Sequence, residues 1–260
     1  MYNNFSKIFK IKMKSKKILV TGTSSGLGKY LSYNLKSFCL NRKKITKKIL
    51  NKKWDLIIHC AYDSKSYDIK NFEKYFEDNV LLSNIIGNLN AKKKIFISTV
   101  QVYEKNLLKN RSENSYIEKS KLSTYPKSKI ICEDFFKKKE DIILRVGSMV
   151  GSSMRENTIS KILKKKISYI NLNQESKFSF VSYNEVLEII KILIKNKKYG
   201  IFNLLRNDLV SLKKISKCLN KKVNFGKYNF QCTRADNKRI NKYFKLNNKT
   251  SLELLRDFNS

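Results

Sequence analysis

Two residues with the spacing of a proton-transfer pair lie near the middle of the chain. Tyr125 and Lys129 are four residues apart, and Pro126 directly follows the tyrosine. Proline is tolerated in the first turn of a helix, so a helix beginning near Pro126 would carry both side chains on one face. A tyrosine has an ordinary pKa of about 10 and needs nearby positive charge to exchange a proton at neutral pH. Lys129 would supply that charge.

A strand is predicted upstream of this helix, over residues 94–99. Its sequence, KIFIST, is apolar and β-branched and ends in the hydroxyl residues Ser98 and Thr99. Functional groups of α/β proteins gather at the carboxyl ends of strands, where a hydroxyl would hold a substrate oxygen beside Tyr125. In so lysine-rich a chain an isolated Tyr-x-x-x-Lys pair also arises by chance in an ordinary helix. Whether this pair is functional therefore depends on the motifs elsewhere in the sequence.

A glycine-rich turn between an apolar strand and an amphipathic helix is the second informative stretch. Residues 17–28 read KILVTGTSSGLG and contain three of the chain's eight glycines. Such a turn lets the backbone approach a diphosphate at the positive end of the helix. The alternative is a tight turn without a ligand. We predict that a dinucleotide is held by Gly22, Thr23, Ser24, Ser25, Gly26, Leu27 and Gly28.

The residues after the second predicted strand, 38–40, indicate which dinucleotide. NAD-binding folds usually place an acidic residue about 20 positions after the glycines, whereas an arginine accommodates the 2′-phosphate of NADP. No acidic residue lies between Gly28 and Asp55, and the sequence instead runs into Asn41-Arg42-Lys43-Lys44. Arg42 therefore favours NADP(H). NAD(H) is the alternative, because the general lysine bias would mimic the same signal.

A third buried strand is predicted over residues 54–61, with the sequence WDLIIHCA. Only 13 residues separate it from Leu40, so one strand-helix unit is expected to be abbreviated. His59, at the end of this strand, is either a catalytic base or a residue packed beneath the cofactor, and we favour the second. Residues 72–90 have helical periodicity and include Asn79.

Composition limits the class of protein. The net charge of +35 is spread along the chain, mostly as lysine, which argues against specific nucleic-acid binding and leaves weak adhesion to polyanions. No apolar run approaches the roughly 18 residues that cross a membrane. Five cysteines without a C-x-x-C pair argue against a disulfide framework and favour the cytoplasm. With one histidine and no close Cys/His cluster, no metal is expected.

The first 16 residues are predicted to be a basic N-terminal extension. They lack the uninterrupted apolar segment and the cleavage site of a secretory signal. We expect residues 1–12 to be an extension or a misassigned start, with Met13 as the alternative first residue.

Taken in order, five segments resemble the extended short-chain dehydrogenase/reductase superfamily, in its NAD(P)-dependent nucleotide-sugar epimerase, dehydratase and reductase branch. These are TGTSSGLG, WDLIIHCA, Asn79-Val80, KIFISTVQVY and YPKSK, and the resemblance extends over about residues 17–205. It implies a Rossmann-type doubly wound parallel sheet over residues 17–150. A small C-terminal α/β substrate lobe over 151–260 would be interleaved with that core.

The resemblance also implies roles for residues at matching positions. Thr99, Tyr125, Lys129 and Asn79 would be catalytic, with Lys129 also binding the nicotinamide ribose beside Ser98, Cys60 and Ala61. The substrate, a nucleotide sugar, would contact Thr99, Val100, Gln101 and Tyr125. A homodimer built on the helices that carry Asn79 and Tyr125 is a further implication. For the helix over residues 183–195 we favour a role in core packing.

The reaction is narrowed by the two residues after Thr99. Dehydratases of this branch usually have Asp and Glu there, whereas this chain has Val100 and Gln101, so dehydration is disfavoured. Reduction of a 4-keto sugar is the favoured reaction. The alternatives are an epimerase with tightly bound NAD and, from another class, a catalytically idle regulator or scaffold that binds the cofactor.

Overall fold

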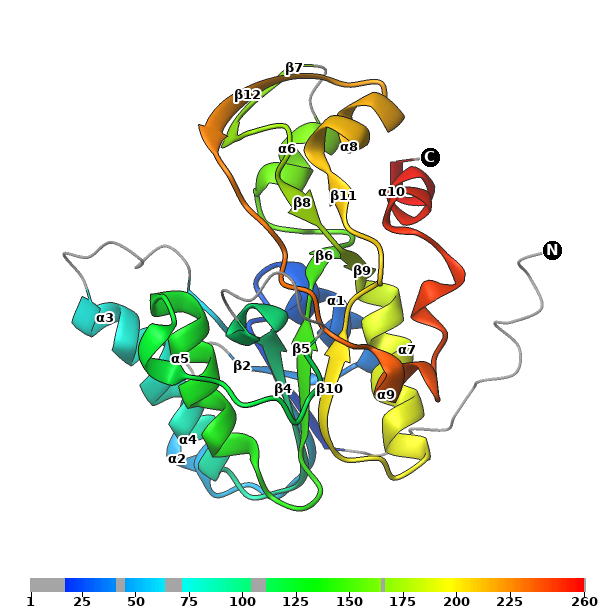
Figure 1. Ribbon diagram of the computed structural model, residues 1–260. Coiled ribbons are helices and arrows are strands. Elements are labelled where there is room, and N and C mark those ends of the chain that lie inside the picture. The colour runs from blue at the N-terminus through cyan, green and yellow to red at the C-terminus, as the bar shows by residue number, and fades with distance from the viewer. Residues whose placement is uncertain (1–16, 41–44, 64–71, 104–110, 165–166, 260) are drawn as a thin grey trace.

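The computed structural model describes residues 17–40, 45–63, 72–103, 111–164 and 167–259. They form a six-stranded sheet between two layers of helices, with a smaller lobe at one end of the sheet (Figure 1). The predicted Rossmann-type α/β fold is confirmed. The N-terminal extension and Arg42 lie outside the described residues.

The central sheet is parallel throughout its registered pairs and has the strand order β10-β5-β4-β3-β1-β2. Strand β1 pairs with β2 on one side and with β3 on the other, so the order of the strands reverses at β1. Ligands of such sheets bind outside the carboxyl ends of the strands where the order reverses. That point lies between β1 and β3. The strands are β1 (Ile18–Thr21), β2 (Phe38–Leu40), β3 (Trp54–His59), β4 (Ala91–Thr99), β5 (Ile142–Val146) and β10 (Gly200–Leu204).

Both faces of the sheet are apolar because helices cover both. Successive strand residues alternate between the faces, so that Ile57 and Phe96 join one core cluster whereas Ile58 and Ile97 join the other. The first cluster packs beneath the π-helical turn η3 (Glu77–Leu81), which continues α3 (Phe72–Phe76), and beneath α4 (Leu82–Asn88) and α5 (Thr124–Glu133). The second packs beneath α1 (Gly26–Leu35) and α7 (Tyr183–Lys195).

The abbreviated unit is present after β2. The four-residue helix α2 (Lys47–Leu50) is the only helix described between β2 and β3. So short a connection does not provide a full covering helix, and Phe38 on this edge strand is 54% exposed. The prediction from segment length is confirmed.

The C-terminal part of the chain contributes to both regions, since α7 and β10 belong to the main layers. Helix α7 begins with a capping box in which Ser182 and Glu185 bond each other's backbone N–H. The lobe pairs β6 (Ser148–Val150) with β9 (Phe180–Ser182), β8 (Lys177–Phe178) with β11 (Val210–Ser211), and β7 (Ile167–Leu172) with β12 (Lys222–Tyr228). Its helices are α6 (Thr158–Lys164), α8 (Leu212–Cys218) and α10 (Ser251–Asn259), whereas α9 (Lys238–Asn241) packs against β10 of the main sheet. A domain boundary at residue 150 stays a prediction.

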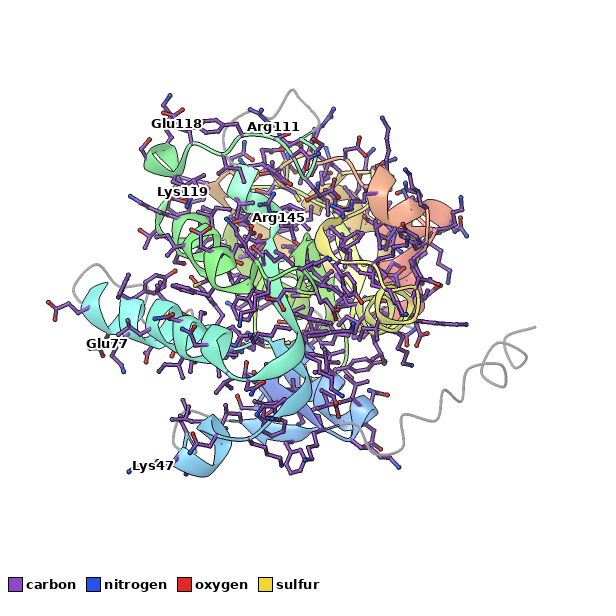
Figure 2. All side chains as sticks on the ribbon, turned by 90° about the horizontal axis from the view of Figure 1, so that it is seen from below. Lys47, Glu77, Arg111, Glu118, Lys119 and Arg145 are labelled. Atoms are coloured by element: carbon purple, nitrogen blue, oxygen red, sulfur yellow. The ribbon has the colours of Figure 1, made fainter. Side chains whose placement is uncertain are left out.

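Short 3₁₀ turns complete the fold at η4 (Val100–Tyr103), η5 (Lys119–Lys121), η6 (Asp134–Phe136) and η7 (Leu246–Asn248). Charged side chains such as Lys47, Glu77 and Glu118 are exposed on the outside, whereas Arg145 lies inside (Figure 2). Among the described residues no helix has the length and apolarity of a membrane span. All five cysteines are free thiols.

Candidate active site

The glycine-rich turn joins β1 to α1 and lies directly against the end of β3. Gly22 has a positive φ of 72°, and a Cβ placed on it would come within 2.7 Å of the backbone N of Ala61. A Cβ on Gly28 would lie 2.3 Å from the Gly22 carbonyl oxygen. Gly22 is therefore required by backbone conformation and by space, and Gly28 by space. The close approach of these backbones forms the floor of a cavity.

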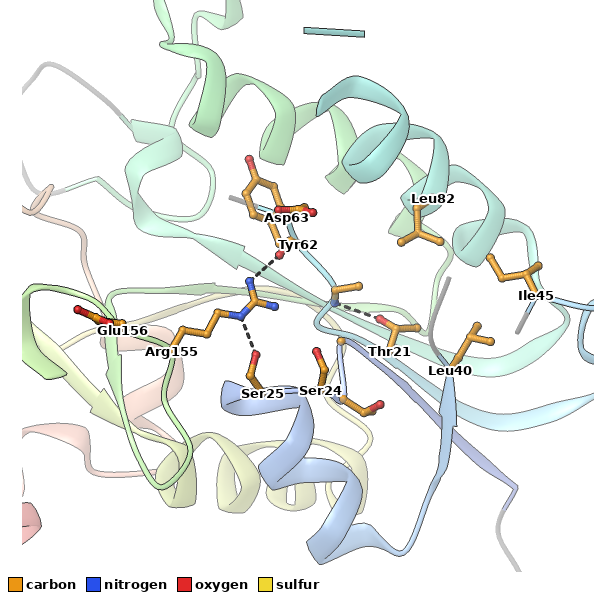
Figure 3. Close-up of a pocket in the computed structure, with 13 residues that line it drawn as sticks. Thr21, Ser24, Ser25, Leu40, Ile45, Tyr62, Asp63, Leu82, Arg155 and Glu156 are labelled. Atoms are coloured by element: carbon orange, nitrogen blue, oxygen red, sulfur yellow. Dashed lines mark hydrogen bonds between the residues drawn. The ribbon is translucent and has the colours of Figure 1, made fainter. Parts of the chain in front are cut away.

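This cavity has a volume of about 800 Å³ and lies at the switch point between β1 and β3 (Figure 3). The hydroxyls of Thr23, Ser24 and Ser25 line its polar part together with the charged residues Asp63, Arg155 and Glu156, and Ala61 lines the neighbouring turn. Cys60 adjoins it with a half-buried thiol whose pKa burial raises to about 12. The apolar part is lined by Leu40, Ile45 and Leu82. An apolar recess next to a helix N-terminus fits the adenosine and diphosphate parts of a dinucleotide.

Arg155 is a residue of this cavity that sequence reasoning missed. It comes from the loop between β6 and α6, and its guanidinium donates to Ser25 Oγ at 2.7 Å and to the Tyr62 carbonyl oxygen at 3.0 Å (Figure 3). The same loop approaches the glycine turn through its backbone, because Gly26 N donates to Ser153 O at 2.8 Å. Arg155 thus brings a positive charge to the glycine-rich turn. Its signal in the sequence was its rarity, as one of eight arginines.

His59 fixes the turn beneath the cavity. Its Nε2 lies 2.9 Å from Ser83 Oγ, and its Nδ1 lies 2.7 Å from Thr21 Oγ1. Ser83 donates its own proton to the Asn79 carbonyl, so it accepts from Nε2–H, and Nδ1 accepts from Thr21. Thr21 Oγ1 in turn accepts from the backbone N–H of Ala61 at 3.1 Å. Burial lowers the pKa of His59 to about 3, which suits a neutral packing residue and not a base.

Asn79 lies in the π-helical turn η3 and is buried. Its side-chain amide donates to the carbonyl oxygens of Asp63 and Tyr75 at 3.1 and 3.0 Å and accepts from the Asp63 N–H at 2.8 Å. These bonds hold the backbone of the segment after β3. In this arrangement Asn79 acts as a positioning residue for that segment. Single π turns are frequent at functional sites of helices.

Thr99 and Tyr125 are brought together at the carboxyl end of β4 and the first turn of α5. Burial raises the pKa of Tyr125 to about 12, and a hydrogen bond with the Thr99 hydroxyl acts in the opposite direction. Both line a second cavity of about 190 Å³. Its remaining walls consist of uncharged residues among those described: Ser98, Val100, Gln101, Val146, Gly147, Ser148, Met149, Phe230 and Cys232.

Lys129 is 5% exposed and faces away from bulk solvent. Its Nζ donates to the Ile97 carbonyl oxygen at 2.9 Å and lies 4.3 Å from the centroid of the Tyr62 ring. Burial lowers the pKa of Lys129 to about 8. In this arrangement the hydrogen bond with Thr99 acts to lower the pKa of Tyr125. Tyr62, which the sequence motifs did not indicate, lies beside both Tyr125 and Lys129.

Ser98 is directed to the protein interior. Its hydroxyl donates to Glu133 Oε1 at 2.6 Å, and Glu133 accepts two bonds from the Arg145 guanidinium at 2.9 and 2.6 Å. All three side chains are buried. The arrangement joins β4, α5 and β5, which together carry Thr99, Tyr125 and Lys129. Ser98 therefore supports the site from behind, although it also borders the small cavity.

These features define a Rossmann-type α/β protein with a cavity at the switch point of its sheet and a hydroxyl and phenol pair nearby. The sequence model of the NAD dependent epimerase/dehydratase family matches residues 34–204. The chain belongs to that family. The match begins after the glycine-rich turn and includes Thr99, Tyr125 and Lys129.

Similar folds occur among solved structures. UDP-glucuronic acid 4-epimerase from Bacillus cereus, in complex with UDP-glucuronic acid and NAD, is 19% identical with a TM-score of 0.74, covering 92% of this chain and 96% of that chain. RMD from Pseudomonas aeruginosa, complexed with NADPH, is 13% identical with a TM-score of 0.72, covering 94% and 99%. A dTDP-4-dehydrorhamnose reductase from Clostridium acetobutylicum is 17% identical with a TM-score of 0.72, covering 93% and 99%. The search of curated proteins gave no significant match. At these identities the likeness concerns the fold.

Proposed function

We propose that this protein is an NAD(P)-dependent oxidoreductase that transfers hydride to or from a sugar carbon of a nucleotide sugar, with reduction of a 4-keto sugar favoured. The observation that carries the proposal is the Thr99–Tyr125 pair at the edge of an uncharged cavity of about 190 Å³. This pair follows strand β4, next to the strand that borders the larger cavity. A substrate oxygen beside Tyr125 would therefore meet a proton donor and a second hydroxyl.

The residues around the larger cavity fit a dinucleotide. Gly22 and Gly28 let the backbone of the turn pack closely against the end of β3, and the first amides of α1 lie next to hydroxyl groups. We propose that Arg155 exchanges its bond to Ser25 for the diphosphate, since a guanidinium bonds phosphate more strongly than a neutral hydroxyl. When bound, the nicotinamide ring supplies or accepts the hydride.

Side chains of this chain would carry out the proton transfer to the substrate oxygen. Because burial raises its pKa to about 12, Tyr125 holds its proton at neutral pH and can deliver it to an alkoxide oxygen as hydride arrives. Thr99 would donate a hydrogen bond to the same oxygen. Lys129 would hold ribose hydroxyls and stabilise the phenolate that remains. A protonated resting tyrosine suits the reduction of a ketone.

The walls of the small cavity suit a sugar ring. Gln101, Ser148 and Thr99 offer donors and acceptors for hydroxyl groups, whereas Met149 and Phe230 offer apolar surface for the face of the ring. The fold is shared with proteins that bind UDP-glucuronic acid or reduce dTDP-4-dehydrorhamnose. The absence of Asp and Glu after Thr99 keeps dehydration disfavoured.

The two candidate reactions, reduction of a 4-keto sugar and epimerisation, differ in how they use the cofactor. The fold is shared with an NAD-bound epimerase and with an NADPH-bound protein, and the basic stretch around Arg42 favours NADP(H). An epimerase retains its cofactor through the cycle, whereas a reductase consumes it. Heat-denatured protein that releases one NAD per chain would favour the epimerase. Protein purified free of dinucleotide that oxidises NADPH with a 4-keto nucleotide sugar would favour the reductase.

The decisive variant is Tyr125→Phe. It should lower turnover by about 100-fold or more, because general acid catalysis contributes about 10²–10⁴-fold, while NADPH or NADH still raises the melting temperature. The measurements are absorbance at 340 nm with a panel of 4-keto and 4-hydroxy nucleotide sugars, and a thermal scan. A wild type that is stabilised by a dinucleotide but turns over no sugar of the panel would favour the idle regulator. Unchanged turnover in Tyr125→Phe would contradict the role of Tyr125, and no thermal shift of the wild type with either dinucleotide would refute the proposal.

A further inference from the structure

Tyr62 lies between the two groups that the proposed chemistry uses. Its ring centroid is 5.2 Å from that of Tyr125, with the two planes at 82°. Lys129 Nζ lies 4.3 Å from the Tyr62 ring centroid. One aromatic side chain therefore contacts the Tyr125 ring in a T-shaped arrangement and the Lys129 ammonium at its face.

The phenol of Tyr62 is anchored at its far end. Its hydroxyl lies 3.1 Å from Ser128 Oγ and is also bonded to the Tyr75 hydroxyl. Ser128 donates its own proton to the Tyr125 carbonyl oxygen at 2.8 Å, so Ser128 accepts from one of the two tyrosine hydroxyls, and the other tyrosine donates within the Tyr62–Tyr75 pair. Arg155 meanwhile holds the Tyr62 carbonyl oxygen. The side chain is thus held in this position by contacts at the ring, the hydroxyl and the backbone.

We propose that Tyr62 is a gate residue that occupies the space between Tyr125 and Lys129 and must swing out when the nicotinamide riboside half of a dinucleotide enters. This inference rests on the proposed function, in which Lys129 reaches the ribose and Tyr125 reaches the reacting oxygen. Tyr62 also lines the larger cavity, so the gate joins the two cavities of the site. The adenosine and diphosphate end can bind without moving it.

The closed position of Tyr62 should lower the affinity for a dinucleotide. A ligand that binds only the open position is weakened by the fraction of molecules that are closed. Closing is favoured by the contact of a buried ammonium with an aromatic face and by two hydroxyl bonds. Opening exchanges the ammonium contact for ribose hydroxyls. Ligands that lack the nicotinamide riboside escape this effect.

The test compares ADP with whichever of NADH and NADPH stabilises the wild type more, by calorimetric titration of the full chain. Tyr62→Ala should tighten binding of the dinucleotide by about tenfold and leave ADP binding within about twofold. Tyr62→Phe keeps the ring and loses the hydroxyl, so it should give a smaller gain. Tyr116→Ala, which removes a tyrosine that is 84% exposed, is the matched control and should change neither ligand.

Three outcomes would overturn the gate. Unchanged dinucleotide affinity in Tyr62→Ala means that the side chain does not compete with the ligand. Weaker dinucleotide binding with unchanged ADP binding means that Tyr62 supports the nicotinamide instead. Equal weakening of both ligands means that Tyr62 only maintains the fold, and if Tyr62→Ala does not fold, Tyr62→Phe decides by the same comparison. Absence of ADP and dinucleotide binding in the wild type would instead refute the proposed function.

Discussion

Among the individual residues of the site, burial keeps Tyr125 and His59 neutral, whereas Lys129 carries charge. Burial raises the pKa of Tyr125 to about 12, lowers that of Lys129 to about 8 and lowers that of His59 to about 3. At neutral pH the tyrosine is therefore protonated, the lysine is mainly charged and the histidine is neutral. Of the three, Tyr125 is the group able to donate a proton beside Thr99. His59 has both ring nitrogens occupied by hydroxyl partners.

Arg155→Ala should weaken ADP binding by about tenfold, because a hydrogen bond to a charged group contributes about 1.5–3 kcal/mol. The measurement is a calorimetric titration at fixed salt. Arg256→Ala on α10 is the matched control, since Arg256 is also exposed and hydrogen-bonds a thiol, Cys218 Sγ. Equal ADP affinity of wild type and Arg155→Ala would show that Arg155 only bridges Ser25 and Tyr62.

At the scale of elements, one buried ion pair and a serine hydroxyl hold α5, β5 and β4 together. Glu133 on α5 accepts from Arg145 on β5 and from Ser98 on β4, and Arg145 also donates to the Tyr103 hydroxyl at 2.6 Å. This places the N-terminal turn of α5, with Tyr125, over the end of β4. The position of the Thr99–Tyr125 pair therefore depends on a polar contact behind the site as well as on apolar packing.

Glu133→Ala should destabilise the fold by about 3–5 kcal/mol, because it leaves the Arg145 charge buried without its partner. Asp134→Ala, one residue further on, removes exposed ion pairs to Lys119 and Lys137 and should change stability by less than about 1 kcal/mol. Urea unfolding at neutral pH measures both. A loss for Glu133→Ala no larger than for Asp134→Ala would contradict this role of the ion pair.

At the scale of the molecule, two cavities lie at one end of a single parallel sheet. The larger follows β1 and β3, and the smaller follows β4 and β5 with walls from the C-terminal lobe, including Phe230 and Cys232. In the proposed function this arrangement would bring a cofactor in the larger cavity close to a substrate in the smaller one. The high positive charge is carried by the surface and plays no part in the walls of the smaller cavity among the described residues.

The stability of the whole molecule should fall in acid through His59. Its folded pKa of about 3 lies below the ordinary value of 6.5, so the unfolded chain binds the extra proton between these values. Its stability contribution is fully present above pH 6.5 and is lost as the pH falls towards 3. From pH 7 to pH 5 the loss is about 2 kcal/mol.

Urea unfolding of wild type and His59→Gln at pH 7 and pH 5 measures this contribution. The variant should show a pH dependence smaller by that amount, whatever its stability at pH 7. A difference between the two pH values that is equal in both proteins would assign the acid sensitivity to other groups.

Much of the fold was readable from the sequence because it rests on local patterns. The apolar strands at 18–20 and 54–59, the start of α5 near Pro126 and the whole of α7 follow from periodicity, glycine and proline. The short connection after β2 followed from segment length. Helix α7 packs in the core as expected, although its first residue, Tyr183, also reaches the glycine turn, 3.3 Å from a Cβ placed on Gly26.

By itself the sequence determined the family resemblance, the sheet, and the strand and helix that carry Thr99, Tyr125 and Lys129. Only the tertiary structure decided what stands between and behind them. Tyr62, Arg155 and Glu133 act on residues 12 to 130 positions away, across elements whose packing no local pattern encodes. The physical reason is that backbone conformation follows from neighbours in the chain, whereas hydrogen bonds, burial and pKa values follow from neighbours in space.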